Sequence, residues 1–101
     1  MGPKEKLILF LINRDPGIQS IYGLVKHFDR ANFPSALRDS IDTLLTFDLI
    51  YVSRNFDNGT PSDYGVTEKG KEYLKTNFNK EEILSYINTF DNPELTRLYV
   101  E

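Results

Sequence analysis

The side chains that most often carry out catalysis are scarce in this chain. It has one histidine, His27, and no cysteine, so a catalytic cysteine–histidine pair is excluded. A serine–histidine–aspartate arrangement would depend on His27, and no nucleophile-elbow pattern accompanies it. No glycine-rich phosphate loop is present, and the acidic runs lack metal-ligand spacing, so we expect no metal and no other cofactor. The sequence therefore predicts that the protein is not an enzyme.

The composition is that of one soluble globular domain, with 40% hydrophobic and 27% charged residues in a chain of 101. Its net charge of −3 comes from the C-terminal segment, because residues 1–77 carry ten basic and ten acidic side chains. Residues 78–101 carry two basic and five acidic ones, so the total charge does not by itself exclude nucleic acid as a partner. The longest apolar run, Leu7–Ile12, is too short to span a membrane, and the lack of cysteine suits a reducing cytoplasm.

Helical periodicity organises the first half of the chain. A first helix is expected over Lys4–Asn13, apolar on most sides and therefore well buried. A second runs over Ile21–Phe28 with Ser20 as its N-cap, and after a short polar link a third runs over Pro34–Phe47. The inward positions of the third helix are Leu37, Ile41, Leu44 and Leu45.

A hairpin and a further helix follow at once. Leu49–Asn55 alternates in polarity and is rich in β-branched and aromatic residues, which predicts a strand. "FDNGTPS" contains the Asn-Gly pair that favours a hairpin turn, and the return strand is expected at Asp63–Val66. Thr67 then caps a fourth helix that ends near Asn77.

The last quarter of the chain is predicted to be helical as well. Asn79, followed by Glu82, has the form of a capping box and starts a fifth helix, and Asn92 caps one more short helical turn with Pro93 at its first position. The predicted fold class is therefore α+β, mostly helical, with a three-helix body and a β-hairpin. We expect residues 1–77 to form this domain and residues 78–101 to be a helical extension.

Three segments carry a resemblance to a known group of proteins. "DPGIQSIYGLVKHF", "SALRDSIDTLLTFDLIYVSR" and "GTPSDYGVTEKGKEYL" resemble the MarR and PadR groups of bacterial winged helix-turn-helix transcription regulators. The resemblance covers about residues 5–77, and Asp48 stands where those groups usually have glycine. It implies a winged helix-turn-helix fold in a dimeric DNA-binding regulator. The third helix would be the recognition helix in the major groove, and the hairpin would be the wing.

The outward side of the third helix is polar and more acidic than basic. At about 100° per residue, with the apolar positions inward, this arc contains Ser35, Asp39, Asp42, Thr43 and Thr46, flanked by Arg38 and Ser40. Two carboxylates would oppose DNA phosphates, although an aspartate can accept a hydrogen bond from cytosine. Arg38 could equally contact DNA or pair with Asp42 one turn away.

Cations outside this helix could supply further phosphate contacts. Lys26 and Arg30 lie at the end of the second helix, and Arg54 is the one basic residue on the hairpin strands, whose tip carries Asp57 and Asp63 instead. The predicted DNA-binding residues are Ser35, Arg38, Asp39, Asp42, Thr43, Lys26, Arg30 and Arg54. For Asp39, Asp42, Lys26 and Arg30 an ordinary solvated surface position is the alternative. We expect His27 to be a surface or partly packed residue, and Phe56 and Tyr64 to pack the hairpin on the body.

The apolar side of the fifth helix needs a partner. In MarR and PadR proteins helices outside the body usually form a two-fold dimer interface. By that resemblance the predicted interface residues are Ile83, Leu84, Ile87, Phe90, Leu95, Leu98 and Tyr99. The alternative is that this helix folds back on its own domain.

Two functions from different classes are consistent with these patterns. The first is a DNA-binding transcription regulator of winged-helix type that binds duplex DNA as a homodimer. The alternative is a winged-helix protein–protein interaction module, without strong DNA binding, whose acidic helix face docks a basic partner. The sequence does not identify a small-molecule effector.

Overall fold

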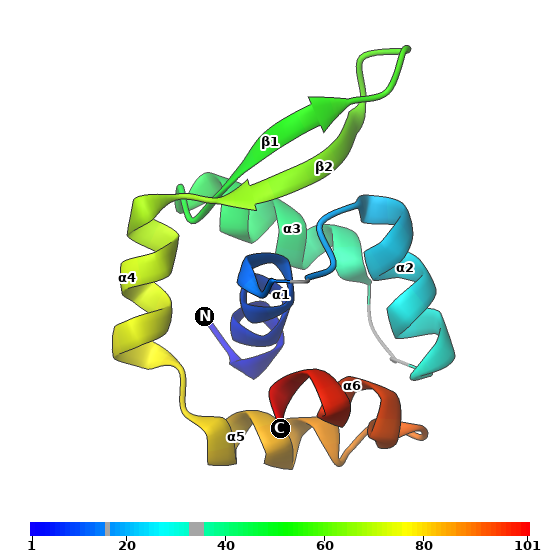
Figure 1. Cartoon of the computed structure of the whole chain (residues 1–101), viewed down its shortest axis with the longest axis vertical. Coiled ribbons are helices and arrows are strands. Elements are labelled where there is room, and N and C mark those ends of the chain that lie inside the picture. The colour runs from blue at the N-terminus through cyan, green and yellow to red at the C-terminus, as the bar shows by residue number, and fades with distance from the viewer. Residues whose placement is uncertain (16, 33–35) are drawn as a thin grey trace.

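The structure of the chain is a computed structural model that describes residues 1–15, 17–32 and 36–101. Within these residues the chain forms six helices and one antiparallel hairpin, which confirms the α+β, mostly helical class (Figure 1). The elements in chain order are α1 (Pro3–Asn13), α2 (Ile21–Arg30), α3 (Leu37–Thr46), β1 (Ile50–Asn55), β2 (Pro61–Val66), α4 (Glu68–Asn77), α5 (Lys80–Ile87) and α6 (Pro93–Val100).

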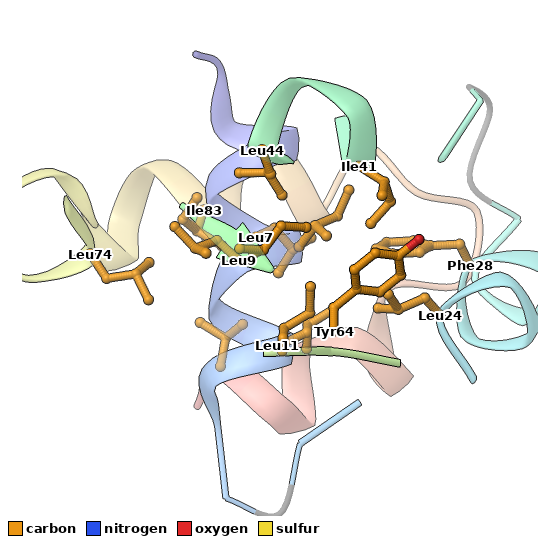
Figure 2. Packing of buried hydrophobic residues seen from close by; sticks show 14 of the residues in the cluster. Leu7, Leu9, Leu11, Leu24, Phe28, Ile41, Leu44, Tyr64, Leu74 and Ile83 are labelled. Carbon is orange, nitrogen blue, oxygen red and sulfur yellow. The ribbon is translucent and has the colours of Figure 1, made fainter. Parts of the chain in front are cut away.

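Helix α1 lies at the centre of the molecule, and the other elements surround it (Figure 1). It contacts α3, α4, α5 and β2. A helix that is apolar on most sides must be covered on most sides. Accordingly, five of its side chains are at most 1% exposed and belong to the hydrophobic core: Leu7, Ile8, Leu9, Leu11 and Ile12. Figure 2 shows three of them, Leu7, Leu9 and Leu11, in the middle of the cluster.

Local capping interactions set most of the helix starts. The hydroxyl of Ser20 accepts a hydrogen bond from the Gly23 amide, and that of Thr67 accepts one from the Gly70 amide. Asn79 likewise accepts one from the Glu82 amide, so the three predicted caps are confirmed. Each bond satisfies an amide that the first helical turn leaves without a partner.

The predicted cap of the last helix behaves differently. Asn92 occupies the N-cap position of α6 and Pro93 follows as predicted, but the Asn92 side chain makes no capping bond. Its amide instead donates to the carbonyl oxygen of Arg30 at 3.1 Å. The side chain therefore ties the start of α6 to the end of α2.

The hairpin turns over Asp57 and Asn58, where the Gly59 amide donates to the Phe56 carbonyl oxygen at 2.9 Å. Gly59 has a φ of +86° that L-residues rarely adopt, whereas Asn58 does not have a positive φ. Strand β1 pairs antiparallel with β2, with Tyr51 opposite Gly65 and Val52 opposite Tyr64. The return strand begins at Pro61, two residues before the predicted start at Asp63. Proline is compatible with this position because it begins an edge strand.

Hydrogen bonds to the ends of the neighbouring helices anchor the base of the hairpin. Asp48 adopts a φ of +59° in the turn from α3 to β1, a left-handed conformation that aspartate tolerates better than most residues. The Thr67 hydroxyl donates to the carbonyl oxygen of Asp48 at 2.7 Å, and the Thr67 amide donates to that of Leu49 at 3.1 Å. The turn before the hairpin and the helix after it are thereby joined.

A second anchor comes from the segment that precedes α2. Ser20 forms an antiparallel bridge with Asp63, and the Tyr64 amide donates to the carbonyl oxygen of Gln19 at 2.8 Å. Strand β2 therefore pairs on both sides over this short stretch. Strand β2 is thus held between β1 and the segment before α2.

The C-terminal helices share the core of the rest of the chain. Helix α5 packs on α1, and the rings of Phe10 and Phe78 stack with their centroids 4.8 Å apart. Ile83 and Ile87 are fully buried and Phe90 is 5% exposed, so these three predicted interface residues pack within the single chain. They belong to its core, because α1 needs an apolar cover that α5 and the residues after it supply. The core crosses the predicted boundary at residue 78.

In the three described ranges no helix combines the length and the apolar character that crossing a membrane would require.

Gly70 offers a test of the junction between the hairpin and α4. A Cβ atom at this position would lie 2.2 Å from the Leu49 carbonyl oxygen and 2.7 Å from a methyl group of Val66. Helix propensity alone would make Gly70→Ala stabilising by up to about 1 kcal/mol. We expect the opposite sign, a loss of about 1–3 kcal/mol in the free energy of unfolding measured by denaturant titration, because the nearer contact is a backbone oxygen that can move away only if the chain itself shifts.

The matched control is Lys69→Ala on the exposed side of the same turn, which should change the free energy of unfolding by less than about 0.5 kcal/mol. A Gly70→Ala variant that is more stable than the wild type would contradict the close approach of α4 to Leu49 and Val66.

Candidate functional site

Helix α3 leaves a polar surface open to solvent on the side away from α1. Arg38, Asp39 and Asp42 are exposed, and so is Thr46 near the end of the helix. Thr43 is half-buried, and its hydroxyl donates to the carbonyl oxygen of Asp39 at 2.9 Å. Ser35, which was predicted to share this surface, and Pro34, the predicted start of the helix, lie outside the described residues.

One residue predicted at the flank of this surface lies on the inward side instead. Ser40 is 1% exposed, and its hydroxyl donates to Glu5 Oε2 at 2.7 Å. The other carboxylate oxygen of Glu5 accepts from the Gly2 amide at 3.0 Å. A single carboxylate thus caps α1 and binds α3, so Ser40 is a packing residue.

The predicted pairing of Arg38 with Asp42 is absent. Among the described residues neither side chain forms an ion pair or a hydrogen bond, although they lie one helical turn apart. Both charges are therefore available to a ligand. The exposed surface of α3 keeps one cation and two carboxylates.

A groove runs between α3, the start of α2 and the hairpin, and we refer to it as the α3–hairpin groove. Its volume is about 310 Å³, and Arg38, Asp42 and Thr60 supply its polar groups. Most of its lining is apolar or aromatic and comes from Ile21, Ile41, Leu45, Phe56, Pro61 and Tyr64.

Tyr64 brings a hydroxyl group into this groove. The side chain extends from β2 into the core cluster, with its hydroxyl turned toward the part of the cluster where Ile41 lies (Figure 2). The residue is only 5% exposed, and its hydroxyl, which bonds to no described residue, keeps contact with solvent. Burial raises the pKa of Tyr64; Arg38 lowers it and Asp42 raises it further. The Tyr64 hydroxyl is therefore a neutral donor at physiological pH, and it lies close enough to Arg38 and Asp42 for their charges to affect its pKa.

The two cations at the end of α2 border a different depression. Lys26 and Arg30 are exposed and line a cleft of about 220 Å³ that Leu95 and Tyr99 of α6 close on the other side. Lys26 also lies over the Tyr22 ring, with Nζ 5.9 Å from the ring centroid. These cations therefore do not share a depression with Arg38.

The hairpin presents one cation and several exposed rings. Arg54 is exposed on β1 and forms no ion pair with a described residue, and Asp57 is exposed at the tip. Tyr51 and Phe56 are about half exposed, at 51% and 48%. Of the two rings predicted to pack the hairpin on the body, Tyr64 does so, and Phe56 lies at the edge of the groove.

His27 is buried, unlike the surface or partly packed residue that the sequence predicted. It is 6% exposed, and its Nε2 lies 2.9 Å from the Thr96 hydroxyl of α6. The Phe28 and Tyr99 rings meet its imidazole edge to face, each with centroids 5.4 Å away. The one histidine of the chain thus joins α2 to α6, and a long-range contact of this kind leaves no local signal in the sequence.

Acidic residues and His27 do not gather into a metal site. Across residues 1–15, 17–32 and 36–101 no group of three or more such side chains is placed to hold a metal ion.

The environment of His27 predicts how stability depends on pH. Burial, with a smaller contribution from Arg30, lowers its pKa below the ordinary value of 6.5, so the unfolded state binds a proton more readily than the folded state. The contribution of His27 to stability is complete above the unfolded pKa and is lost as the pH falls through it toward the folded pKa. We expect the melting temperature to drop as the pH is lowered from about 7 to about 5.5.

The variant His27→Gln keeps an amide that can bond to Thr96 but does not titrate, so its melting temperature should change less over the same pH interval. An equal change in the variant and the wild type would show that His27 titrates as it does in the unfolded chain.

Comparisons with known proteins identify no relative. No protein-family model matches the chain, no curated protein matches its sequence, and no solved structure matches its fold significantly. A functional interpretation therefore depends on the residues and geometry described above.

Proposed function

We propose that the chain is a winged-helix transcription regulator that binds duplex DNA, with α3 as the recognition helix and the β1–β2 hairpin as the wing. The observation that carries this proposal is the position of the hairpin beside an α3 helix whose polar side is open. Strand β2 pairs with the segment before α2 through Ser20 and Gln19, which fixes the hairpin next to α2 and α3. Two successive helices followed by an anchored hairpin are the parts that a winged helix-turn-helix uses to contact a major groove and the flanking backbone.

Two exposed arginines support contact with phosphates: Arg38 of α3 and Arg54 of β1. Neither forms an ion pair with a described carboxylate, so no internal bond must break before it meets DNA. Guanidinium groups suit this role because they bind phosphate oxygens in a bidentate manner. Asp39 and Asp42 lie on the same surface, so the affinity should be modest and strongly dependent on salt.

Removing an acidic or a basic side chain from this surface should change the affinity for DNA in opposite directions. The assay is fluorescence anisotropy with a random-sequence duplex of about 30 base pairs at about 30 mM NaCl. Removing one carboxylate with Asp39→Asn or Asp42→Asn should tighten binding about fivefold, since one repulsive unit charge near a phosphate costs on the order of 1 kcal/mol. Arg38→Ala and Arg54→Ala should weaken binding and lower the slope of log affinity against log salt by about 1 each.

The control for charge alone is Glu81→Gln on α5, which alters the net charge equally but lies on a helix outside the proposed interface. If neither the wild type nor the Asp39→Asn/Asp42→Asn double variant binds the duplex at low salt, the DNA proposal is wrong.

A second candidate is a protein-interaction module whose acidic α3 surface docks a basic partner. It is favoured by the two unpaired aspartates on α3 and by the position of Lys26 and Arg30, which border the α6 cleft and not the α3–hairpin groove. The double variant separates the two candidates. Removing both carboxylates should strengthen binding to DNA, because they repel its phosphates. It should weaken binding to a basic partner, because they attract its positive charges.

We also propose that the protein acts as a homodimer. The interface would be the solvent-exposed part of α6, which does not pack into the core. Leu98 is 72% exposed, and Leu95, Tyr99 and, on α5, Leu84 are half-buried. These four are the members of the predicted interface that a second copy could reach. A two-fold dimer would present two α3 helices to the half-sites of a palindrome.

Leu98→Lys tests this arrangement, since a charge at the centre of an apolar interface must be buried without a partner. Light scattering coupled to size-exclusion chromatography should give twice the mass of one chain for the wild type and the mass of one chain for the variant. The matched control is Phe47→Lys, the same kind of change at an apolar residue that is 54% exposed and lies outside α5 and α6, and it should leave the mass unchanged. A wild type that elutes with the mass of a single chain at high concentration would rule the dimer out.

A further inference from the structure

The α3–hairpin groove has features that neither DNA binding nor packing explains. Its apolar lining reaches from α2 across α3 to the hairpin and includes Ile41, Leu45 and Phe56. Phe56 is still 48% exposed, so the groove is open to solvent. At about 310 Å³ it is at the small end of the range of ligand pockets, and this suits a molecule smaller than a nucleotide.

The hydroxyl of Tyr64 is the first indication of a ligand. Tyr64 is 5% exposed, and no described residue bonds to its hydroxyl. Because the described residues include no buried side-chain oxygen without a partner, this hydroxyl keeps some contact with solvent. Tyr64 lines the groove, so a molecule seated there could replace water as the hydrogen-bond partner of the hydroxyl.

The charges at the rim are the second indication. Arg38 and Asp42 both line the groove, and they belong to one side of α3, one turn apart. Their Cβ atoms are therefore separated by about 5–6 Å, and yet the two side chains do not pair with each other. One cation and one anion at this spacing fit a ligand that carries both charges on neighbouring atoms.

We propose that the α3–hairpin groove binds a free apolar α-amino acid. Its carboxylate would accept hydrogen bonds from the Arg38 guanidinium and the Tyr64 hydroxyl, and its ammonium group would donate to the Asp42 carboxylate. Its side chain would cover Ile41, Leu45 and Phe56, removing apolar surface from water. A neutral hydrocarbon would leave both rim charges unmatched, and a simple carboxylic acid or amine would match only one of them.

The test is a titration of the ¹⁵N-labelled protein with L-leucine and L-phenylalanine up to about 10 mM, followed by amide chemical shifts. We expect saturable shifts in α3 and β2. N-acetyl-leucine lacks the ammonium charge and leucinamide lacks the carboxylate, so each should bind at least about tenfold more weakly than leucine. Glycine has the same charges without a side chain and should produce no saturable shift.

Variants identify the groups involved. Arg38→Gln and Asp42→Asn remove one charge each from exposed positions and should weaken leucine binding at least about tenfold, and Tyr64→Phe should weaken it by a smaller factor. Lys69→Gln on α4 removes one exposed positive charge away from the groove; it is the matched control and should bind leucine as the wild type does. Unchanged spectra outside the groove establish that each variant is folded.

Three results would each overturn the proposal: no saturable shift at the highest concentration, equal binding of leucine and its two blocked derivatives, or shifts centred on the cleft between α2 and α6. The titration contains no DNA. Its outcome is therefore separate from that of the DNA-binding measurements.

Discussion

The burial of α1 on all sides is the interaction on which the rest of the structure depends. Burying its five core side chains contributes on the order of 10 kcal/mol, which is as large as the whole net stability of a typical domain. No single neighbour could cover a helix that is apolar around most of its circumference. Helices α3, α4 and α5 and strand β2 each cover part of it, so their relative positions are set by one shared partner.

This arrangement explains why α3 and the hairpin form one exposed surface. Helix α3 turns Ile41 and Leu44 toward the core, and its polar side is left in solvent. The hairpin is then fixed next to it by hydrogen bonds from Thr67 to Asp48 and from Tyr64 to Gln19. The surface is therefore held in place before any ligand arrives, which lowers the cost of ordering it on binding.

Features encoded over a few residues could be predicted from the sequence. The Asn-Gly turn and the caps at Ser20, Thr67 and Asn79 each depend on neighbours within a turn or two, and the structure has all of them. The coarse class followed from the same local patterns. The winged-helix assignment and the DNA-binding residues stay predictions, because they depend on a partner that is not part of the chain.

Features that depend on distant partners could not be predicted. The apolar side of α5 was compatible with a second copy or with α1, and only the three-dimensional structure distinguishes the two for Ile83 and Ile87. The side chain of Ser40 points to Glu5, and that of His27 to Thr96. The α3–hairpin groove also depends on residues that are distant in the sequence, because α2, α3 and the hairpin each contribute to its lining. No single one of these segments predicts the groove.

The measurement that tests the central place of α1 most directly is native-state amide hydrogen exchange, resolved by residue. If every other element packs against α1, the amides of Leu9, Leu11 and Ile12 should exchange only through global unfolding and be the slowest in the protein. Exchange in α3 and at the hairpin tip should be faster and proceed through local opening. The account would be contradicted if the α1 amides exchanged by local opening while those of α6 or the hairpin stayed protected.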